Sequence, residues 1–183
     1  MAHSIELLLD DVADAWVRVQ WQRLIDAGLP SQGRVEAQTN RPHITLVAAE
    51  HLHPAIDSGL AALISQLPIS IRFAGIVAFG REQKTLALKV SRDTALDEFQ
   101  AETLAVARPW ITAVVDHVES DSWTPHVTLA RSLTDDQLAR ATELIAAPPS
   151  AAATLLRRWD GDAKSEKRFI SEHRPTIKTI RGL

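Results

Sequence analysis

The first half of the chain alternates between two apolar patterns, which predict strands and helices in turn. The short apolar run from Ser4 to Leu9 is typical of a strand. The three-to-four spacing of Val12, Trp16 and Val19 after it is typical of a helix, which the stretch Gly28-Leu29-Pro30 ends. The predicted elements that follow are a loop at 31–40, a strand at 43–47, a helix at 55–66 and a strand at 69–79.

The second half repeats this order. A strand at 85–90 is predicted to form a hairpin with 69–79, because a polar, glycine-containing stretch separates the two apolar runs. The predicted elements that follow are a helix from about Asp93, a strand at 123–131, a helix after the cap residue Thr134, and strands at 152–159 and 167–173. We therefore expect an internal duplication with pseudo-repeats at about 1–84 and 85–183.

The expected fold class is α+β. Two similar lobes, each a mostly antiparallel sheet with helices outside, should form one bilobal domain over residues 1–183 with a cleft between them. The strongest support is a motif that occurs twice, as RPHITLV at 41–47 and TPHVTLA at 124–130. His126 follows His43 by 83 residues, close to the offset of about 80 between the two leading strands.

The repeated motif also has a predicted geometry. Successive side chains of a strand alternate between its faces, so His43 and Thr45 should point the same way, as should His126 and Thr128. If the lobes are related by an approximate two-fold axis, two imidazoles and two hydroxyls meet across the cleft. In-line displacement at phosphorus needs a base and an acid on opposite sides, and histidine suits both tasks near neutral pH. Hydroxyl donors can stabilise the phosphoryl oxygens without a metal.

Composition narrows the classes of function. With 183 residues and 45% apolar content, the chain can bury the core of a domain. Cysteine is absent, which excludes disulfides, thiolate metal sites and thiol nucleophiles. No apolar run reaches about 18 residues, so we expect no membrane span. The start of the chain is unlike a secretory signal, so we expect a cytoplasmic protein.

The net charge of −3 argues against broad electrostatic binding to long nucleic acid, for which a basic footprint supplies the affinity. The charge is uneven, however, because residues 157–183 hold eight Lys or Arg against four acidic residues. Such a segment can attract a phosphate-bearing ligand or can be a solvated surface, and the sequence leaves both open.

The segments PHITL (42–46) and WTPHVTLAR (123–131) resemble the paired His-x-Thr signatures of the two-histidine (2H) phosphoesterase superfamily. The closest likeness is to its bacterial branch of 2′-5′ RNA ligases and RNA 2′,3′-cyclic phosphodiesterases. The resemblance implies that the protein opens a 2′,3′-cyclic phosphate, at an RNA terminus or in a small cyclic nucleotide, to a 2′-phosphate. It implies no metal or other cofactor and allows a 2′-5′ ligase activity. We expect a monomer.

Carried over to this chain, the resemblance makes His43 the proton donor to the leaving 3′ oxygen and His126 the base that activates water. Thr45 and Thr128 would hold the phosphate. Arg131 would be a further phosphate contact, but residues 126, 128 and 130 share a face, so this requires the strand to end or bulge there. A surface arginine is the alternative, and the first motif has only an alanine at position 48.

Two other functions stay open. One is a non-catalytic module that binds phosphate-bearing RNA ends in the same cleft. The other is a metal-dependent hydrolase using His51 and His53, although two loop histidines without a third ligand nearby seldom make a metal site. Trp123 and Phe79 lie near strand ends that could border the cleft, and we expect core packing rather than base stacking for both.

Overall fold

The structure is a computed structural model and describes residues 3–114 and 122–170. The larger sheet contains β1 (His3–Leu9), β2 (His43–Leu52), β3 (Ile69–Ile71), β6 (Ile111–Val114), β8 (Ala151–Asp160) and β9 (Ser165–Phe169). The smaller sheet contains β4 (Phe73–Phe79), β5 (Lys84–Val90) and β7 (His126–Leu133). The α-helices of the described residues are α1 (Asp11–Asp26), α2 (Asp57–Leu63), α3 (Thr94–Ala107) and α4 (Asp135–Leu144). Short 3₁₀ turns are η1 (Gln32–Arg34), η2 (Pro54–Ile56), η3 (Ile64–Gln66) and η4 (Arg108–Trp110).

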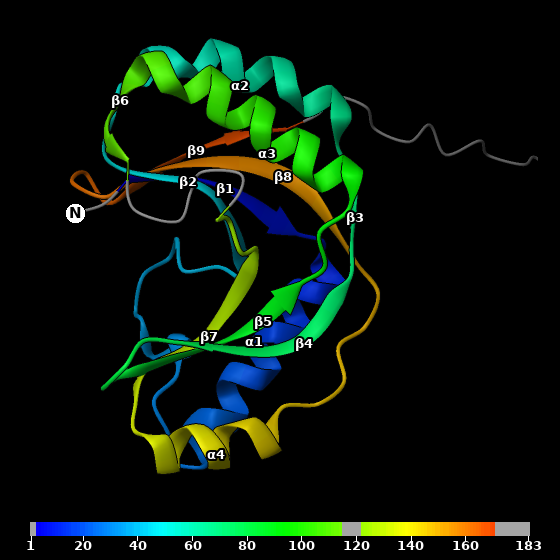
Figure 1. Cartoon of the computed structure of the whole chain (residues 1–183), viewed down its shortest axis with the longest axis vertical. Coiled ribbons are helices and arrows are strands. Elements are labelled where there is room, and N and C mark those ends of the chain that lie inside the picture. The colour runs from blue at the N-terminus through cyan, green and yellow to red at the C-terminus, as the bar shows by residue number, and fades with distance from the viewer. Residues whose placement is uncertain (1–2, 115–121, 171–183) are drawn as a thin grey trace, which may run out of the picture.

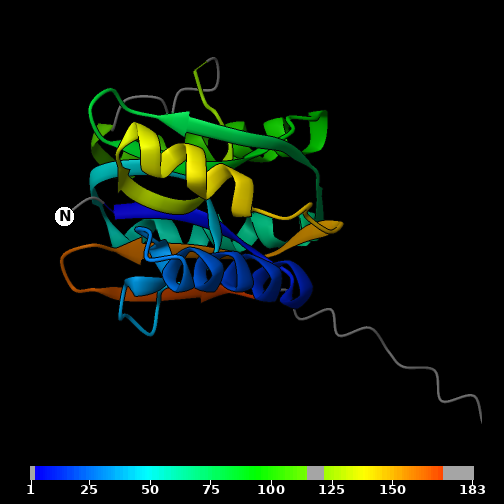
Figure 2. The same ribbon diagram turned by 90° about the horizontal axis from the view of Figure 1, so that it is seen from below.

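Both sheets are antiparallel, which agrees with the predicted α+β class. The larger sheet has the order β3-β8-β1-β2-β6, with β9 paired to β8, and the smaller has the order β4-β5-β7. Helices α2 and α3 cover the larger sheet, α4 lies at the opposite end of the molecule next to the smaller sheet, and α1 contacts strands of both sheets (Figure 1). The view from below shows α1 and α4 side by side (Figure 2).

The chain crosses between the sheets, so neither sheet corresponds to one half of the sequence. Strands β6, β8 and β9 of the second half join β1 and β2 of the first. Helix α3 follows β5 of the smaller sheet but packs on β2, where Gln100 Nε2 donates to the Leu46 carbonyl at 3.2 Å. Helix α1 follows β1 but contacts β7 of the smaller sheet. One contiguous apolar cluster accordingly includes residues of both sheets.

Helix α1 starts where the sequence predicts but buries a different face. The Asp10 side chain caps it by accepting a hydrogen bond from the Ala13 N–H at 2.8 Å. Val12 and Val19, which were predicted to face the core, are 67% and 51% exposed. The buried stripe consists of Ala13, Val17, Gln20, Trp21 and Leu24. The predicted helix is confirmed, and its predicted inner face is wrong by about one residue.

Two other strand predictions need correction. The alternating run 69–79 forms two strands rather than one, since β3 ends at Ile71 in the larger sheet and β4 begins at Phe73 in the smaller. Strand β6 was not predicted. Part of the strand expected at 167–173 lies outside the described residues, as do three of the eight Lys and Arg residues of the segment 157–183. Within the described chain, no helix combines the length and apolar character needed to cross a membrane.

Candidate active site

The first motif lies on β2 beside the central strand β1. His43 is paired with Leu8 and Thr45 with Glu6 in this antiparallel ladder. The next pair advances by one residue on β1 and by two on β2, so Leu46 is the extra residue of a β-bulge directly after the threonine. The histidine and threonine lie on one face of the strand, whereas Ile44 between them is fully buried.

The second motif has the same register on β7. His126 is paired with Lys89 and Thr128 with Ala87 of β5, and the next pair again advances by one residue on β5 and by two on β7. The extra residue is Leu129, which corresponds to the extra leucine of the first motif. The two His-x-Thr segments therefore occupy equivalent positions in two strand pairs.

The bulge on β7 decides the side on which Arg131 lies. On an unbroken strand Arg131 would point away from His126 and Thr128. The extra residue reverses the alternation, because Leu129 and Ala130 are both buried and Arg131 follows on the exposed face. The condition for a phosphate contact from Arg131 is thus met. The equivalent residue after the first bulge is Ala48, so the second motif supplies an arginine at this position and the first does not.

Both imidazoles are held in the same way. His43 Nδ1 lies 2.7 Å from the Arg41 carbonyl oxygen, and His126 Nδ1 lies 2.7 Å from the Thr124 carbonyl oxygen. Each carbonyl accepts a hydrogen bond from Nδ1–H, two residues after it in sequence, which fixes the tautomer and ring orientation. Nε2 of each ring is therefore the nitrogen that can exchange a proton with a substrate.

The surroundings of His126 favour its neutral form. Burial lowers the pKa of His126 most, and the nearby positive charges of Arg131 and His43 lower it further, while the hydrogen bond to the Thr124 carbonyl raises it in part. The ring also packs against Phe79, with centroids 4.8 Å apart. The influence of His43 on this pKa indicates that the two imidazoles lie within electrostatic range of each other.

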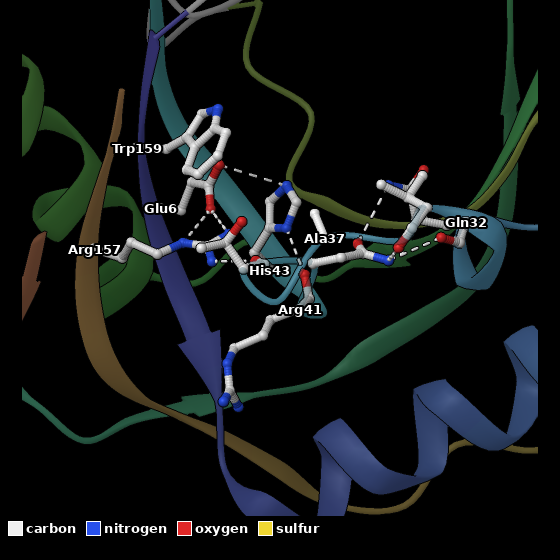
Figure 3. A pocket seen from close by; sticks show the side chains of 10 residues that line it. Glu6, Gln32, Ala37, Arg41, His43, Arg157 and Trp159 are labelled. Atoms are coloured by element: carbon white, nitrogen blue, oxygen red, sulfur yellow. Dashed lines mark hydrogen bonds and ion pairs between the residues drawn. The ribbon is translucent and has the colours of Figure 1, made fainter. Parts of the chain in front are cut away.

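His43 has a buried carboxylate as its neighbour. Its Nε2 lies 3.6 Å from Oε1 of Glu6, which is 4% exposed on β1 (Figure 3). The Glu6 carboxylate accepts hydrogen bonds from Ser4 Oγ at 2.6 Å and Arg157 Nε at 2.8 Å. Burial raises the pKa of Glu6, but the charges of His43 and Arg157 and these hydrogen bonds outweigh it, so the pKa lies below its ordinary value. The Glu6 carboxylate therefore places a negative charge beside Nε2 of His43.

The two threonines are fixed through their backbone. The indole N–H of Trp123 donates to the Thr45 carbonyl at 2.9 Å, and the indole N–H of Trp21 donates to the Thr128 carbonyl at 3.0 Å. Trp123 itself is 5% exposed, which confirms core packing for that residue. Because each bond ties a motif to another part of the chain, both threonines have a defined backbone position.

Two hollows flank the histidines. One of about 180 Å³ borders His43 and is lined by Glu6, Arg157 and the loop that ends at Arg41 (Figure 3). Gln32 of this lining accepts a hydrogen bond from Arg131 Nε at 3.4 Å, which links the second motif to the hollow beside the first. The other hollow, of about 530 Å³, lies on the side of the second motif and is lined by Lys89, Ser91, Arg92, Trp123, Thr124 and Pro125 among others.

The sequence profile of the 2′-5′ RNA ligase superfamily matches residues 10–159, which include both motifs. The chain belongs to this superfamily. The predicted kinship with the two-histidine phosphoesterases is thereby confirmed.

The fold of this superfamily member also resembles solved structures. Usb1 of Kluyveromyces marxianus matches with a TM-score of 0.54 and 12% identity, over 93% of this chain and 98% of that one. A second structure of the same protein, with uridine monophosphate, matches with a TM-score of 0.48 and 11% identity, over 93% and 97% of the two chains. At such identities the likeness concerns the fold alone. No curated protein sequence matches significantly.

Sequence reasoning missed two residues of this superfamily member's site, Glu6 and Arg157. A signal for Glu6 was present, because a lone carboxylate interrupts the apolar run SIELLL on a strand. Arg157 lies 151 residues from Glu6 in the chain, so no local pattern could connect the two.

His51 and His53, the two histidines considered for a metal-dependent hydrolase, make separate contacts. His53 Nδ1 accepts a hydrogen bond from the Ala55 N–H at 3.2 Å, and its ring stacks on Trp110 with centroids 5.7 Å apart. His51 instead contacts the ring of His3, with centroids 5.2 Å apart. The two histidines thus have different neighbours.

Proposed function

We propose that this superfamily member is a metal-independent phosphodiesterase that hydrolyses a 2′,3′-cyclic phosphate to a 2′-phosphate. The substrate is an RNA terminus or a small cyclic nucleotide. The observation that carries the proposal is the equivalent placement of His43 and His126, each tethered through Nδ1 and each followed by a threonine on the same face. Membership of the superfamily supports the same class of chemistry.

In the proposed reaction, water attacks phosphorus and the bond from phosphorus to the 3′ oxygen breaks on the opposite side. His126 Nε2 accepts a proton from the attacking water, and His43 Nε2 donates a proton to the leaving 3′ oxygen. The products are a 2′-phosphate and a free 3′ hydroxyl. If the 5′ hydroxyl of a second RNA attacks in place of water, the same steps form a 2′-5′ phosphodiester.

The opposite electrostatic settings of the two histidines support this division of roles. A base must be neutral before reaction, and burial with two nearby positive charges lowers the pKa of His126. An acid must give up a proton, and Glu6 places a negative charge 3.6 Å from Nε2 of His43. The two histidines are therefore suited to a concerted mechanism, in which one takes a proton from water while the other gives a proton to the leaving group.

The non-bridging phosphate oxygens need donors in the transition state. We assign this task to the hydroxyls of Thr45 and Thr128 and to the guanidinium of Arg131. Arg131 adds a full positive charge on the side of the base, where the attacking water approaches. The exposed Lys89, paired with His126 across the β5–β7 ladder, extends the positive surface toward the larger hollow.

The decisive experiment measures hydrolysis of a 2′,3′-cyclic mononucleotide in the presence of EDTA, with the product identified as a 2′-phosphate. Turnover should persist in the chelator and fall at least about 10²-fold in both His43→Ala and His126→Ala, the loss typical of a missing general acid or base. His53→Ala is the matched control and should keep full activity. Retained turnover in either active-site variant contradicts the proposal.

Two other outcomes point to the alternative functions. Binding of the cyclic nucleotide without turnover by the wild-type protein would favour the non-catalytic module for phosphate-bearing RNA ends. Loss of activity in EDTA that Zn²⁺ restores would favour a metal-dependent hydrolase. Cytoplasmic localisation and a monomeric state stay predictions.

A further inference from the structure

A cluster of metal-ligating side chains lies where three segments of the larger sheet meet. His3 is at the start of β1, His51 is near the end of β2, and Asp162 is in the turn between β8 and β9. One ligand atom of each residue lies within 4.8 Å of those of the other two. No local sequence pattern groups them, because His3 and Asp162 are 159 residues apart.

His3 has the arrangement of a metal ligand with a supporting carboxylate. It is 1% exposed, and its Nε2 lies 3.1 Å from Asp162 Oδ2. Its other nitrogen, Nδ1, is buried, makes no hydrogen bond within the described chain, and lies 3.6 Å from Asp160 Oδ1. Histidines that bind a metal through one nitrogen usually direct the other toward a carboxylate or carbonyl. Asp160 stands in that supporting position.

The remaining two ligands complete an accessible site. The ring of His51 meets that of His3 edge to face, at 70° between planes, and is exposed to solvent. Asp160 Oδ1 accepts backbone hydrogen bonds from Asp162 at 3.0 Å and from Ala163 at 2.9 Å, which orders the turn that carries Asp162. An ion can therefore enter from solvent and reach a buried histidine and an exposed carboxylate on an ordered turn.

We propose that His3, His51 and Asp162 bind a divalent transition-metal ion, with Zn²⁺ the best match. Two imidazoles and one carboxylate are a typical zinc donor set, and a water can complete the tetrahedron. Mg²⁺ and Ca²⁺ prefer oxygen ligands and fit this set poorly.

The site is separate from the proposed phosphodiesterase centre. On β1, His3 and Ile5 point to one face of the sheet, whereas Ser4 and Glu6 point to the other, which carries His43. The bound ion would link β1, β2 and the β8–β9 turn and stabilise the larger sheet by mass action. It has no part in the phosphate chemistry, so the inference stands whether or not the proposed function holds.

The test is a titration of the untagged full-length protein with Zn²⁺ in competition with a chromogenic chelator. We expect one ion per chain and a higher melting temperature in excess Zn²⁺. His51→Ala, at an exposed position, should lose this binding, and Asp160→Asn should weaken it by about 10–100-fold. His53→Ala, two residues further along the chain, is the matched control and should bind as the wild type does.

Three results would overturn the inference. The first is the absence of saturable binding by the wild-type protein. The second is unchanged affinity in His51→Ala. The third is binding that survives His51→Ala but disappears in His43→Ala or His126→Ala, which would locate the ion in the phosphate cleft. The His3→Ala variant is less informative because His3 is buried and its loss can unfold β1.

Discussion

Glu6 Oε1 lies 3.6 Å from His43 Nε2, and the chain has Ala87 at the position equivalent to Glu6 beside the second motif. A carboxylate therefore accompanies one histidine of the pair, while Arg131 accompanies the other. Two motifs with the same backbone register thus differ in the charge that surrounds them. The difference supports the proposed roles of His43 as the proton donor and His126 as the proton acceptor.

Replacing Glu6 by Gln should impair the acid more than the base. The variant removes the negative charge 3.6 Å from His43 Nε2, the nitrogen proposed to protonate the leaving oxygen, so kcat at neutral pH should fall. The measurement is kcat at neutral pH with a cyclic mononucleotide.

The matched control for this change is Glu166→Gln. Glu166 Oε2 accepts a hydrogen bond from Arg157 Nη1 at 2.8 Å, so this variant also removes a partner of Arg157. It leaves the Glu6 carboxylate beside His43, and kcat should stay close to that of the wild type. An equal fall of kcat in both variants would mean that the contacts of Arg157, rather than the Glu6 charge, determine the rate.

Replacing Arg131 by Gln should affect the base. Burial lowers the pKa of His126 first, and Arg131 adds to this effect, so loss of the guanidinium raises the pKa of His126. A base is lost as pH falls through its pKa, and the acid limb of kcat/KM should therefore move to higher pH. Arg131→Lys keeps the charge and should leave that limb nearly unchanged. A limb that does not move in Arg131→Gln would mean that Arg131 lies too far from His126 to act on it.

Removing one threonine hydroxyl should slow the chemical step without changing the fold. Thr45→Val and Thr128→Val keep the shape of the side chain and the backbone carbonyls that the two indoles bind. Loss of a single donor to a developing anion costs about 10²–10³ in kcat, and we expect the lower end because several donors share the phosphate. Thr→Ser at each position should restore most of the rate. Valine variants with wild-type kcat would exclude the hydroxyls from transition-state stabilisation.

The paired motifs and the order of the elements could be predicted because both depend on local sequence patterns. The bulges after Thr45 and Thr128 could not, since the extra residues are ordinary leucines and no glycine marks either position. The orientation of Arg131 depends on one of these bulges. Sequence analysis could therefore give only the condition for a phosphate contact, namely that the strand ends or bulges near Arg131. The structure shows that the condition is met.

Other features depended on long-range packing. The inner face of α1 includes Gln20, whose amide donates to the Trp16 carbonyl at 3.2 Å and accepts from the Ala146 N–H at 3.1 Å. A glutamine with such partners can be buried, which shifts the helix face away from the two exposed valines. Likewise, the alternation through 69–79 continues across Arg72 although the chain changes sheet there, because both strands have the same period.

The ion pair of Glu6 and Arg157 should make stability depend on pH. The pKa of Glu6 is below the ordinary value of 4.5, because its burial is outweighed by His43, Arg157 and Ser4. A carboxyl whose pKa is lower in the folded state contributes stability that is present above its unfolded pKa and is lost as pH falls through the folded pKa. The urea concentration at the midpoint of unfolding should therefore decrease more steeply below about pH 4.5 in the wild type than in Glu6→Gln.

At pH 7 the Glu6→Gln variant should be less stable by about 3–5 kcal/mol, since Arg157 is left buried without this partner. Parallel acid transitions in the two proteins would show that other carboxyls govern the loss.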